Sequence, residues 1–158
     1  NKTYDSTYVG LFTDFDLGNP EDDYVGCDVD RSVFYAYNGD AFDEDGGAAI
    51  GYGAHPPYQG VTFLKGAKQD DDGIDNAFGI APYETVNGYG FGDGITDNEH
   101  WGMEHFFTFL NYGGFNGVPT NDYETHLYLK GKWRDNTNFV YGGNGHVSGG
   151  GTIPTKYL

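Results

Sequence analysis

Three short stretches of this chain are rich in aromatic and β-branched side chains and are bounded by loop or turn residues, and this pattern predicts β-strands. The first stretch covers residues 8–15 and is followed by an acidic loop at residues 16–30. The second, residues 32–37, is rich in aromatic side chains and ends at an Asn-Gly-Asp turn signal, residues 38–40. The third, residues 60–64, is a shorter strand of the same kind.

From about residue 97 onward, the large side chains recur at the spacing of an α-helix. Asp97 or Asn98 is the expected N-cap of a helix that continues to about Tyr112. Large side chains recur there at the spacing of one helix face: Trp101, His105, Phe106, Phe109 and Leu110.

A second, shorter helix is predicted over residues 121–130, because Asn121 and Glu124 have the spacing of a capping box and a glycine follows the last residue. Residues 133–141 are expected to return to a strand. The glycine-rich tract at residues 142–151 is expected to be flexible.

These elements place the chain in the mainly β (α+β) class. We expect a β-sandwich with a helical insertion near residues 97–131 and long loops rich in glycine and aspartate. The 27 glycines favour turns, whereas 14 tyrosines and 12 phenylalanines can build a core from few side chains. The 158 residues suffice for a single domain. Since the chain begins without Met, we expect that domain to be excised from a longer secreted protein.

Charge narrows the choice of partners. The chain has 8 basic and 24 acidic residues, which gives a formal net charge of −16. Nucleic acids and anionic membrane surfaces are bound through lysine and arginine, so the sequence predicts neither as a partner. Cys27 is the single cysteine, so an internal disulfide is impossible and another source of stability is required.

The acidic residues form three clusters interrupted by glycine, and carboxylates held together in this way require solvent or a cation between them. Calcium accepts six to eight oxygen ligands from aspartate, asparagine and backbone carbonyls in flexible loops. We therefore expect bound calcium. The candidate ligands are Asp14, Asp16, Asn19, Asp22, Asp23, Asp28, Asp70, Asp72, Asp75, Asp93, Asp97 and Glu99.

The first cluster is the more specific signal, because Asp14 and Asp16 would share one face of the expected strand, with Asp22 or Asp23 returning a few residues later. The other two clusters share an Asp-Gly-Ile repeat followed by Asp-Asn, at residues 72–76 and 93–98. Neither repeat is an EF-hand, since the twelfth loop position lacks the bidentate glutamate. The alternative for every cluster is capping and turn bonding by aspartate and asparagine.

Catalytic motifs are weak. His100 and His105 are five residues apart, which does not match the spacing of a zinc-protease helix. Cys27 lies in an acidic loop that disfavours its thiolate, so a small half-buried residue is expected there. The serines lack an esterase elbow, and no carboxylate pair stands out as a glycosidase dyad. The histidines that carry no signal are His55, His126 and His146.

Several strings resemble a family of large secreted surface proteins exported by the type IX secretion pathway. They occur in the expected order at residues 13–20, 22–28, 35–40, 51–57, 92–99 and 141–146. The resemblance implies a long extracellular protein with β-rich modules and a C-terminal sorting domain, which this chain does not contain. It supplies a location, namely secreted and at the cell surface. It supplies no catalytic residues.

The sequence thus predicts a non-catalytic, calcium-stabilised extracellular domain that acts in adhesion or scaffolding. The expected partners are calcium ions, the rest of the parent chain and a surface glycan or protein. The alternative is a glycan-binding module attached to a secreted hydrolase. An exposed aromatic platform beside a metal site would favour that alternative, whereas buried aromatic side chains would favour the scaffold. A hydrolase would require a pocket with convergent carboxylates.

Overall fold

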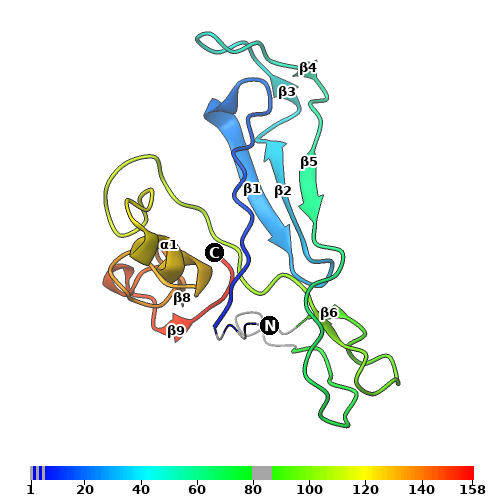
Figure 1. Ribbon diagram of the computed structural model, residues 1–158. Helices are drawn as coiled ribbons and strands as arrows, with labels where there is room; N and C mark the ends of the chain where they lie inside the picture. Colours follow the sequence, from blue (N-terminus) through cyan, green and yellow to red (C-terminus); the bar gives the residue numbers. More distant parts are fainter. Residues whose placement is uncertain (1, 3, 5, 80–86) are drawn as a thin grey trace. The chain divides into compact units, whose positions relative to one another are not determined.

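The computed structural model describes residues 2, 4, 6–79 and 87–158, and the chain divides into two units (Figure 1). The first, which we call the sheet unit, contains Thr13–Gly79 and the described part of Val86–Met103. The second, which we call the aromatic unit, contains the described residues up to Phe12 together with Glu104–Leu158. Each unit is described by itself.

The sheet unit is built on a three-stranded antiparallel sheet in the order β1-β2-β5 (Figure 1). Its strands are β1 (Asp23–Asp28), β2 (Val33–Asn38) and β5 (Gln59–Thr62), and the short 3₁₀-helix η1 (Pro20–Asp22) leads into β1.

Side chains alternate across this sheet, so its two faces differ. On one face Ala36 and Asn38 are only 0% and 6% exposed, and Phe15 packs against Phe34 with 5.8 Å between ring centroids. Leu17 is also buried. The segment that precedes β1 therefore contributes to the packing of this face.

Two short strand pairs complete the sheet unit. β3 (Phe42–Asp43) pairs with β4 (Gly53–Ala54), and β6 (Gly88–Tyr89) pairs with β7 (His100–Trp101), both antiparallel.

The aromatic unit contains helix α1 (Asp122–Leu129), the strand pair β8 (Val140–Tyr141) and β9 (Ile153–Pro154), and the 3₁₀-helix η2 (Val147–Gly149). Its core consists of buried Tyr128, Trp133 and Phe139. Half-buried side chains pack around them: Phe107, Phe109, Phe115 and Leu158.

The polar atoms of this core are satisfied. Trp133 Nε1 donates to the Gly145 carbonyl at 2.8 Å, and the Tyr128 hydroxyl donates to the Gly117 carbonyl at 2.5 Å. Burial raises the pKa of Tyr128 to about 12, so the phenol stays protonated and keeps this bond. Each aromatic side chain buries about 150–250 Å², so a small number of them is enough to fill this core.

Three sequence predictions are confirmed. The strand expected at residues 32–37 is β2, and the strand expected at residues 60–64 overlaps β5. The shorter helix is α1, where Glu124 N donates to Asn121 Oδ1 at 3.0 Å. Gly131 follows the helix with a left-handed φ of 67°, as expected of its stop signal.

The helix predicted from Asp97 to Tyr112 is wrong. Asp97 has a left-handed φ of 58°, and the amides that follow bond to distant segments instead of the preceding turn. Trp101 N donates to the Ala67 carbonyl, and Phe106 N donates to the Lys156 carbonyl. Long-range pairing therefore overrides the helical period of the apolar side chains.

The strand predicted at residues 8–15 is also wrong, since this stretch forms no ladder within the described part of the chain. Its side chains pack individually, as when Phe12 stacks on Phe109 at 5.4 Å. The acidic loop expected at residues 16–30 contains β1. Of the strand expected at residues 133–141, only the last two residues are in β8.

The mainly β class is confirmed, because the regular elements among the described residues are mostly short strands, with one α-helix. A β-sandwich is not confirmed. The described sheets are one set of three strands and three pairs.

Candidate metal centre

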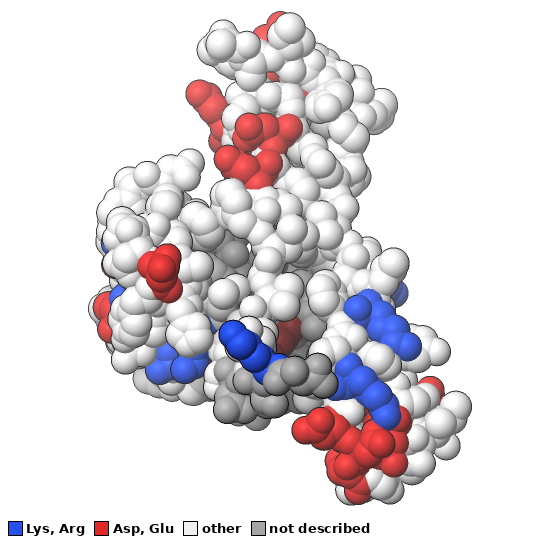
Figure 2. Space-filling view, viewed as in Figure 1, with Lys and Arg blue, Asp and Glu red and all other residues white. Residues whose placement is uncertain are grey.

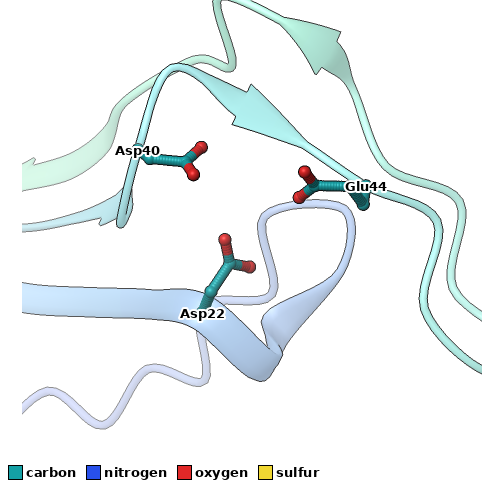
Figure 3. A group of neighbouring side chains, drawn as sticks. All are labelled: Asp22, Asp40 and Glu44. Carbon is teal, nitrogen blue, oxygen red and sulfur yellow. The ribbon is translucent and has the colours of Figure 1, made fainter.

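Three carboxylates meet at one end of the sheet unit. One oxygen each from Asp22, Asp40 and Glu44 lies within 4.8 Å of the other two, and the side chains point into a common space (Figure 3). Calcium-bound oxygens at about 2.3–2.6 Å from the ion are at most roughly 5 Å apart, so this spacing fits one calcium ion. We call these three residues the carboxylate group.

Local turns place these side chains. Gly39 N donates to the Asp22 carbonyl at 2.9 Å, which ties the start of β1 to the turn after β2. Within that turn, Asp40 Oδ1 accepts from Phe42 N at 2.8 Å. Asp40 lies before β3 and Glu44 directly follows it, so the chain on both sides of this short strand supplies a carboxylate.

The buried carboxylate beside the group, Asp43, has a structural role. It is 1% exposed, its Oδ1 accepts from Asn19 N at 3.2 Å and its Oδ2 accepts from Tyr52 N at 2.8 Å. Both carboxylate oxygens thus accept hydrogen bonds from backbone amides. The two bonds connect the segments that contain Asn19, Asp43 and Tyr52. Asn19 in turn caps η1 through its side chain.

Oxygen atoms near the carboxylate group lack donors. Asp22 Oδ1 and Asp23 Oδ1 are buried and have no hydrogen-bond partner among the described residues. The pKa of Asp23 is raised by burial, and the nearby charges of Asp22, Asp43 and Asp16 raise it further, against a bond from Leu17 N that lowers it. A cation beside these atoms would relieve both the missing bonds and the repulsion.

The structure separates the other predicted ligands of the first cluster from this group. Asp14 and Asp16 are exposed, and they do not lie on a common strand as expected. Asp28 pairs with Arg31, and that hydrogen bond lowers its pKa. Of the predicted ligands, Asp22 alone is in the carboxylate group. Metal binding by Asp14 and Asp16 stays a prediction.

The two Asp-Gly-Ile repeats come together in space, in the loops between β5 and β7. Asp97 Oδ1 accepts from the backbone amides of Asp72 and Gly73, both at 2.8 Å. Asp75 Oδ2 accepts from Gly94 N at 2.7 Å. Each repeat thus supplies a carboxylate that binds the glycine turn of the other. We call this arrangement the crossed loops.

Within each repeat the first aspartate closes its own turn. Asp72 Oδ1 accepts from Ile74 N at 3.0 Å, and Asp93 Oδ1 accepts from Ile95 N at 2.9 Å. Buried Glu99 accepts from Asn76 N at 2.7 Å. Most carboxylates of the two repeats therefore accept hydrogen bonds from backbone amides. This is the turn-bonding alternative that the sequence left open. Asp70 is exposed.

Acidic side chains gather over these loops and again beside the start of β1 (Figure 2). Within the crossed loops, Asp75 Oδ1, Asn98 Oδ1 and Gln69 Oε1 are buried without a donor among the described residues. They remain candidate cation ligands. The carboxylate group has the stronger geometry, because its three charged oxygens converge.

Sequence reasoning missed two members of the carboxylate group. Asp40 belongs to the Asn-Gly-Asp turn, which was interpreted only as a turn signal, and Glu44 lies in the acidic stretch after it. The missed signal is the pairing of β1 with β2, because it brings residues before the first strand beside residues after the second.

The structure also joins Ser148, His146 and Asp135, although His146 carried no sequence signal. His146 Nε2 lies 2.9 Å from Asp135 Oδ2, and its Nδ1 lies 2.6 Å from Ser148 Oγ. Nδ1 also accepts from the Ser148 amide at 3.1 Å, so the ring caps η2. The ring nitrogens are used in the reverse order of a hydrolase triad, and Phe115 stacks on the imidazole at 4.2 Å. This arrangement fits a structural cap.

The remaining nucleophile and zinc candidates lose support. Burial, and next the charge of Asp28, raises the pKa of the half-buried Cys27 thiol, which stays protonated at neutral pH. His100 is in β7 and its Nδ1 contacts the Gly66 carbonyl at 2.9 Å. His105 belongs to the other unit, where burial lowers its pKa.

Comparison with family models, with characterised proteins and with solved structures finds no match for this chain. The resemblance to type IX surface proteins therefore rests on the sequence strings alone. None of the helices among the described residues combines the length and the apolar character required to cross a bilayer.

Proposed function

We propose that this chain is a non-catalytic, calcium-stabilised extracellular domain of a secreted cell-surface protein that acts in adhesion or scaffolding. The observation that carries the proposal is the convergence of Asp22, Asp40 and Glu44, with the donorless Asp22 Oδ1 among them. The calcium ion joins the start of β1 to the turn after β2 and thereby fixes one end of the sheet.

Calcium suits this group better than other common metal ions. The three ligands offer oxygen alone, which disfavours zinc, since zinc sites in proteins rely on cysteine and histidine. The ligands come from turns, and backbone carbonyls and water complete the coordination. Magnesium demands near-ideal octahedral geometry and gives up its water reluctantly, whereas calcium tolerates an irregular shell.

The extracellular location rests on the resemblance and on the need for another source of stability. Cys27 has no cysteine partner in the sequence, and calcium at extracellular concentrations supplies an alternative to a disulfide. The assignment as non-catalytic rests on the capping geometry of His146 and on the protonated Cys27 thiol.

Calcium titration of the purified chain by calorimetry tests the proposal. We expect a dissociation constant of about 10⁻⁴ to 10⁻³ M, as in other extracellular calcium modules. The variants Asp40→Asn and Glu44→Gln each remove one charged ligand without changing size, and each is expected to weaken binding at least tenfold. Glu21→Gln is the matched control, because Glu21 is an exposed carboxylate beside Asp22 but outside the group.

The same affinity in the wild type, both ligand variants and the control would refute a calcium ion at the carboxylate group. Binding that vanishes in Asp75→Asn instead would assign calcium to the crossed loops.

A further inference from the structure

A row of tyrosines crosses the sheet unit from β1 to β5. Tyr24 and Tyr37 are register partners, with 5.9 Å between ring centroids and 27° between ring planes. Tyr37 and Tyr58 continue the row with a centroid distance of 6.1 Å and an angle of 23°. Tyr35, two residues along β2, lies 6.1 Å from Tyr37. Successive rings in the order Tyr24, Tyr37 and Tyr58 are therefore close to parallel, whereas the ring of Tyr35 is tilted by 42° from that of Tyr37.

Two glycines make room for these rings. A Cβ atom on Gly39 would lie 2.7 Å from Tyr24 Cε2, and a Cβ atom on Gly26 would lie 2.9 Å from the Tyr35 hydroxyl oxygen. Neither glycine has the positive φ that would require glycine for backbone reasons. Gly26 lies inside β1, where glycine weakens a strand, so its presence indicates a close approach, and Gly39 directly follows β2. Here the approaching atoms belong to the side chains of Tyr24 and Tyr35.

The two tyrosines at the ends of the row are exposed to solvent. Tyr24 is 57% exposed and Tyr58 is 78% exposed, although Ala36 on the opposite face of the sheet is fully buried. Within the described part of the chain, the hydroxyls of Tyr24, Tyr37 and Tyr58 have no hydrogen-bond partner. The row therefore presents apolar ring surface together with free polar tips.

The charge of this surface limits what it binds. None of the three strands contains lysine or arginine, and the whole chain carries a formal charge of −16. Anionic ligands are repelled by that field. Aromatic faces are electron-rich and attract the weakly polarised C–H groups of a sugar ring, while the phenol hydroxyls match sugar hydroxyls. An uncharged glycan fits both features.

The dimensions favour an extended chain over a globular partner. Three tyrosines offer at most about 150–250 Å² each, even when fully covered. A standard protein interface buries about 800 Å² on each partner, which this row alone does not supply. A narrow row of near-parallel rings instead matches a flat, linear polymer whose successive sugar units meet successive rings.

We propose that Tyr24, Tyr37 and Tyr58 form a binding site for an uncharged, extended polysaccharide, with pyranose faces packed on the tyrosine rings. The site goes beyond the calcium role. It needs no cation in contact with the sugar, and it is separate from any hydrolytic activity. It gives the proposed adhesion role a neutral glycan as its ligand, and in this it rests on that role.

Affinity electrophoresis in native gels tests the site, with hydroxyethylcellulose and glucomannan as neutral probes and carboxymethylcellulose as an anionic probe on the same backbone as the first. Calcium is present throughout, so that loss of the metal is not confused with loss of the site. We expect retardation by at least one neutral probe and none by carboxymethylcellulose. The double variant Tyr24→Ala/Tyr58→Ala is expected to raise the dissociation constant roughly tenfold, since one aromatic contact contributes about threefold or more.

The matched control is Tyr123→Ala/Tyr141→Ala, which removes two tyrosines of the aromatic unit that are 61% and 63% exposed. A further variant, Gly26→Ala, keeps every tyrosine but displaces Tyr35, whose ring lies 6.1 Å from that of Tyr37, and is therefore expected to disturb the row and weaken binding as well. Circular dichroism confirms that each variant is folded. The proposal is overturned by no retardation on either neutral probe, by equal retardation on carboxymethylcellulose, or by equal effects of the two double variants.

Discussion

Aspartate carboxylates in this protein often serve as acceptors for backbone amides, and Asp97 is the clearest case. One of its oxygens accepts from two consecutive amides of the opposite loop. Hydrogen bonds to a charged group contribute about 1.5–3 kcal/mol to stability. At this residue the acidic composition is therefore explained by loop closure without a metal ion.

We predict that Asp97→Ala lowers the free energy of unfolding of the sheet unit by roughly 1.5–3 kcal/mol, measured by urea denaturation. Asp97→Asn should cost less, because asparagine keeps one acceptor oxygen and tolerates the left-handed φ of 58°. Asp70→Ala, at an exposed carboxylate, is the control and should change little. Equal effects of Asp97→Ala and Asp70→Ala would contradict the role assigned to the crossed loops.

Glu124 and Arg134 form a bidentate ion pair in the aromatic unit. Arg134 Nε donates to Glu124 Oε2 at 2.9 Å and Nη2 donates to Oε1 at 3.2 Å, with both side chains less than one-fifth exposed. The Arg134 hydrogen bond, followed by that of the Thr120 amide, lowers the pKa of Glu124 from 4.5 to about 2. This carboxylate therefore stabilises the fold in its charged form.

Because the folded pKa is below the unfolded one, the contribution of Glu124 is fully present above about pH 4.5 and declines as the pH falls towards 2. We predict that Glu124→Gln lowers the melting temperature at pH 7 and that the difference from wild type shrinks below pH 4. Thermal melts across this range measure it. A difference that stays constant down to pH 2 would mean that the charge of Glu124 plays no part.

At the scale of elements, local signals predicted structure correctly where neighbours along the chain decide it. Helix α1 begins at Asn121, whose side chain caps it, and a glycine ends it. Gly131 is required twice, for its φ of 67° and because a Cβ would collide with the His105 ring. Strand β2 was predicted equally well, because its aromatic and β-branched residues fit a central strand.

Local sequence signals gave wrong predictions where hydrogen bonds between distant segments determine the structure. Residues 98–110 have a helical spacing of apolar groups, but their amides bond to segments up to fifty residues away, such as Lys156. The sequence failed to predict the carboxylate group for the same reason, since Asp40 and Glu44 reach Asp22 only through strand pairing. No pattern within a short window of sequence contains that information.

We predict that Asn121→Ala destabilises the aromatic unit by about 1 kcal/mol, because the amide of Glu124 then loses its cap. Asn121→Asp should be nearly neutral, since aspartate caps as well and its charge favours the positive end of the helix. Urea denaturation of both variants checks this. Equal destabilisation by alanine and aspartate would show that the packing of Asn121, and not its cap, matters.

At the scale of the whole molecule, the proposal makes stability depend on calcium, because the chain is strongly acidic and its single cysteine has no cysteine partner. At roughly 2 mM calcium and a dissociation constant near 0.1 mM, one site adds about 1.8 kcal/mol to the free energy of unfolding. That corresponds to about 4–7 °C for a chain of this length. Calcium would thus contribute as much as a well-placed buried side chain.

We predict that a chelator lowers the melting temperature by about this amount, and that calcium restores it better than magnesium at the same ionic strength. Fixed ionic strength is essential, because salt also screens the repulsion among the carboxylates. Coincident melting curves in chelator, calcium and magnesium would mean that the acidic clusters are solvated turns.

The most direct test of the calcium site is hydrogen exchange followed by mass spectrometry, in calcium and in chelator. With calcium at about twenty times its dissociation constant, amides at residues 19–23 and 38–44 should exchange up to roughly twentyfold more slowly where exchange requires opening of the site. The amides of α1 should exchange at the same rate in both conditions. No protection, or protection confined to residues 69–76 and 93–98, would contradict a calcium ion held by Asp22, Asp40 and Glu44.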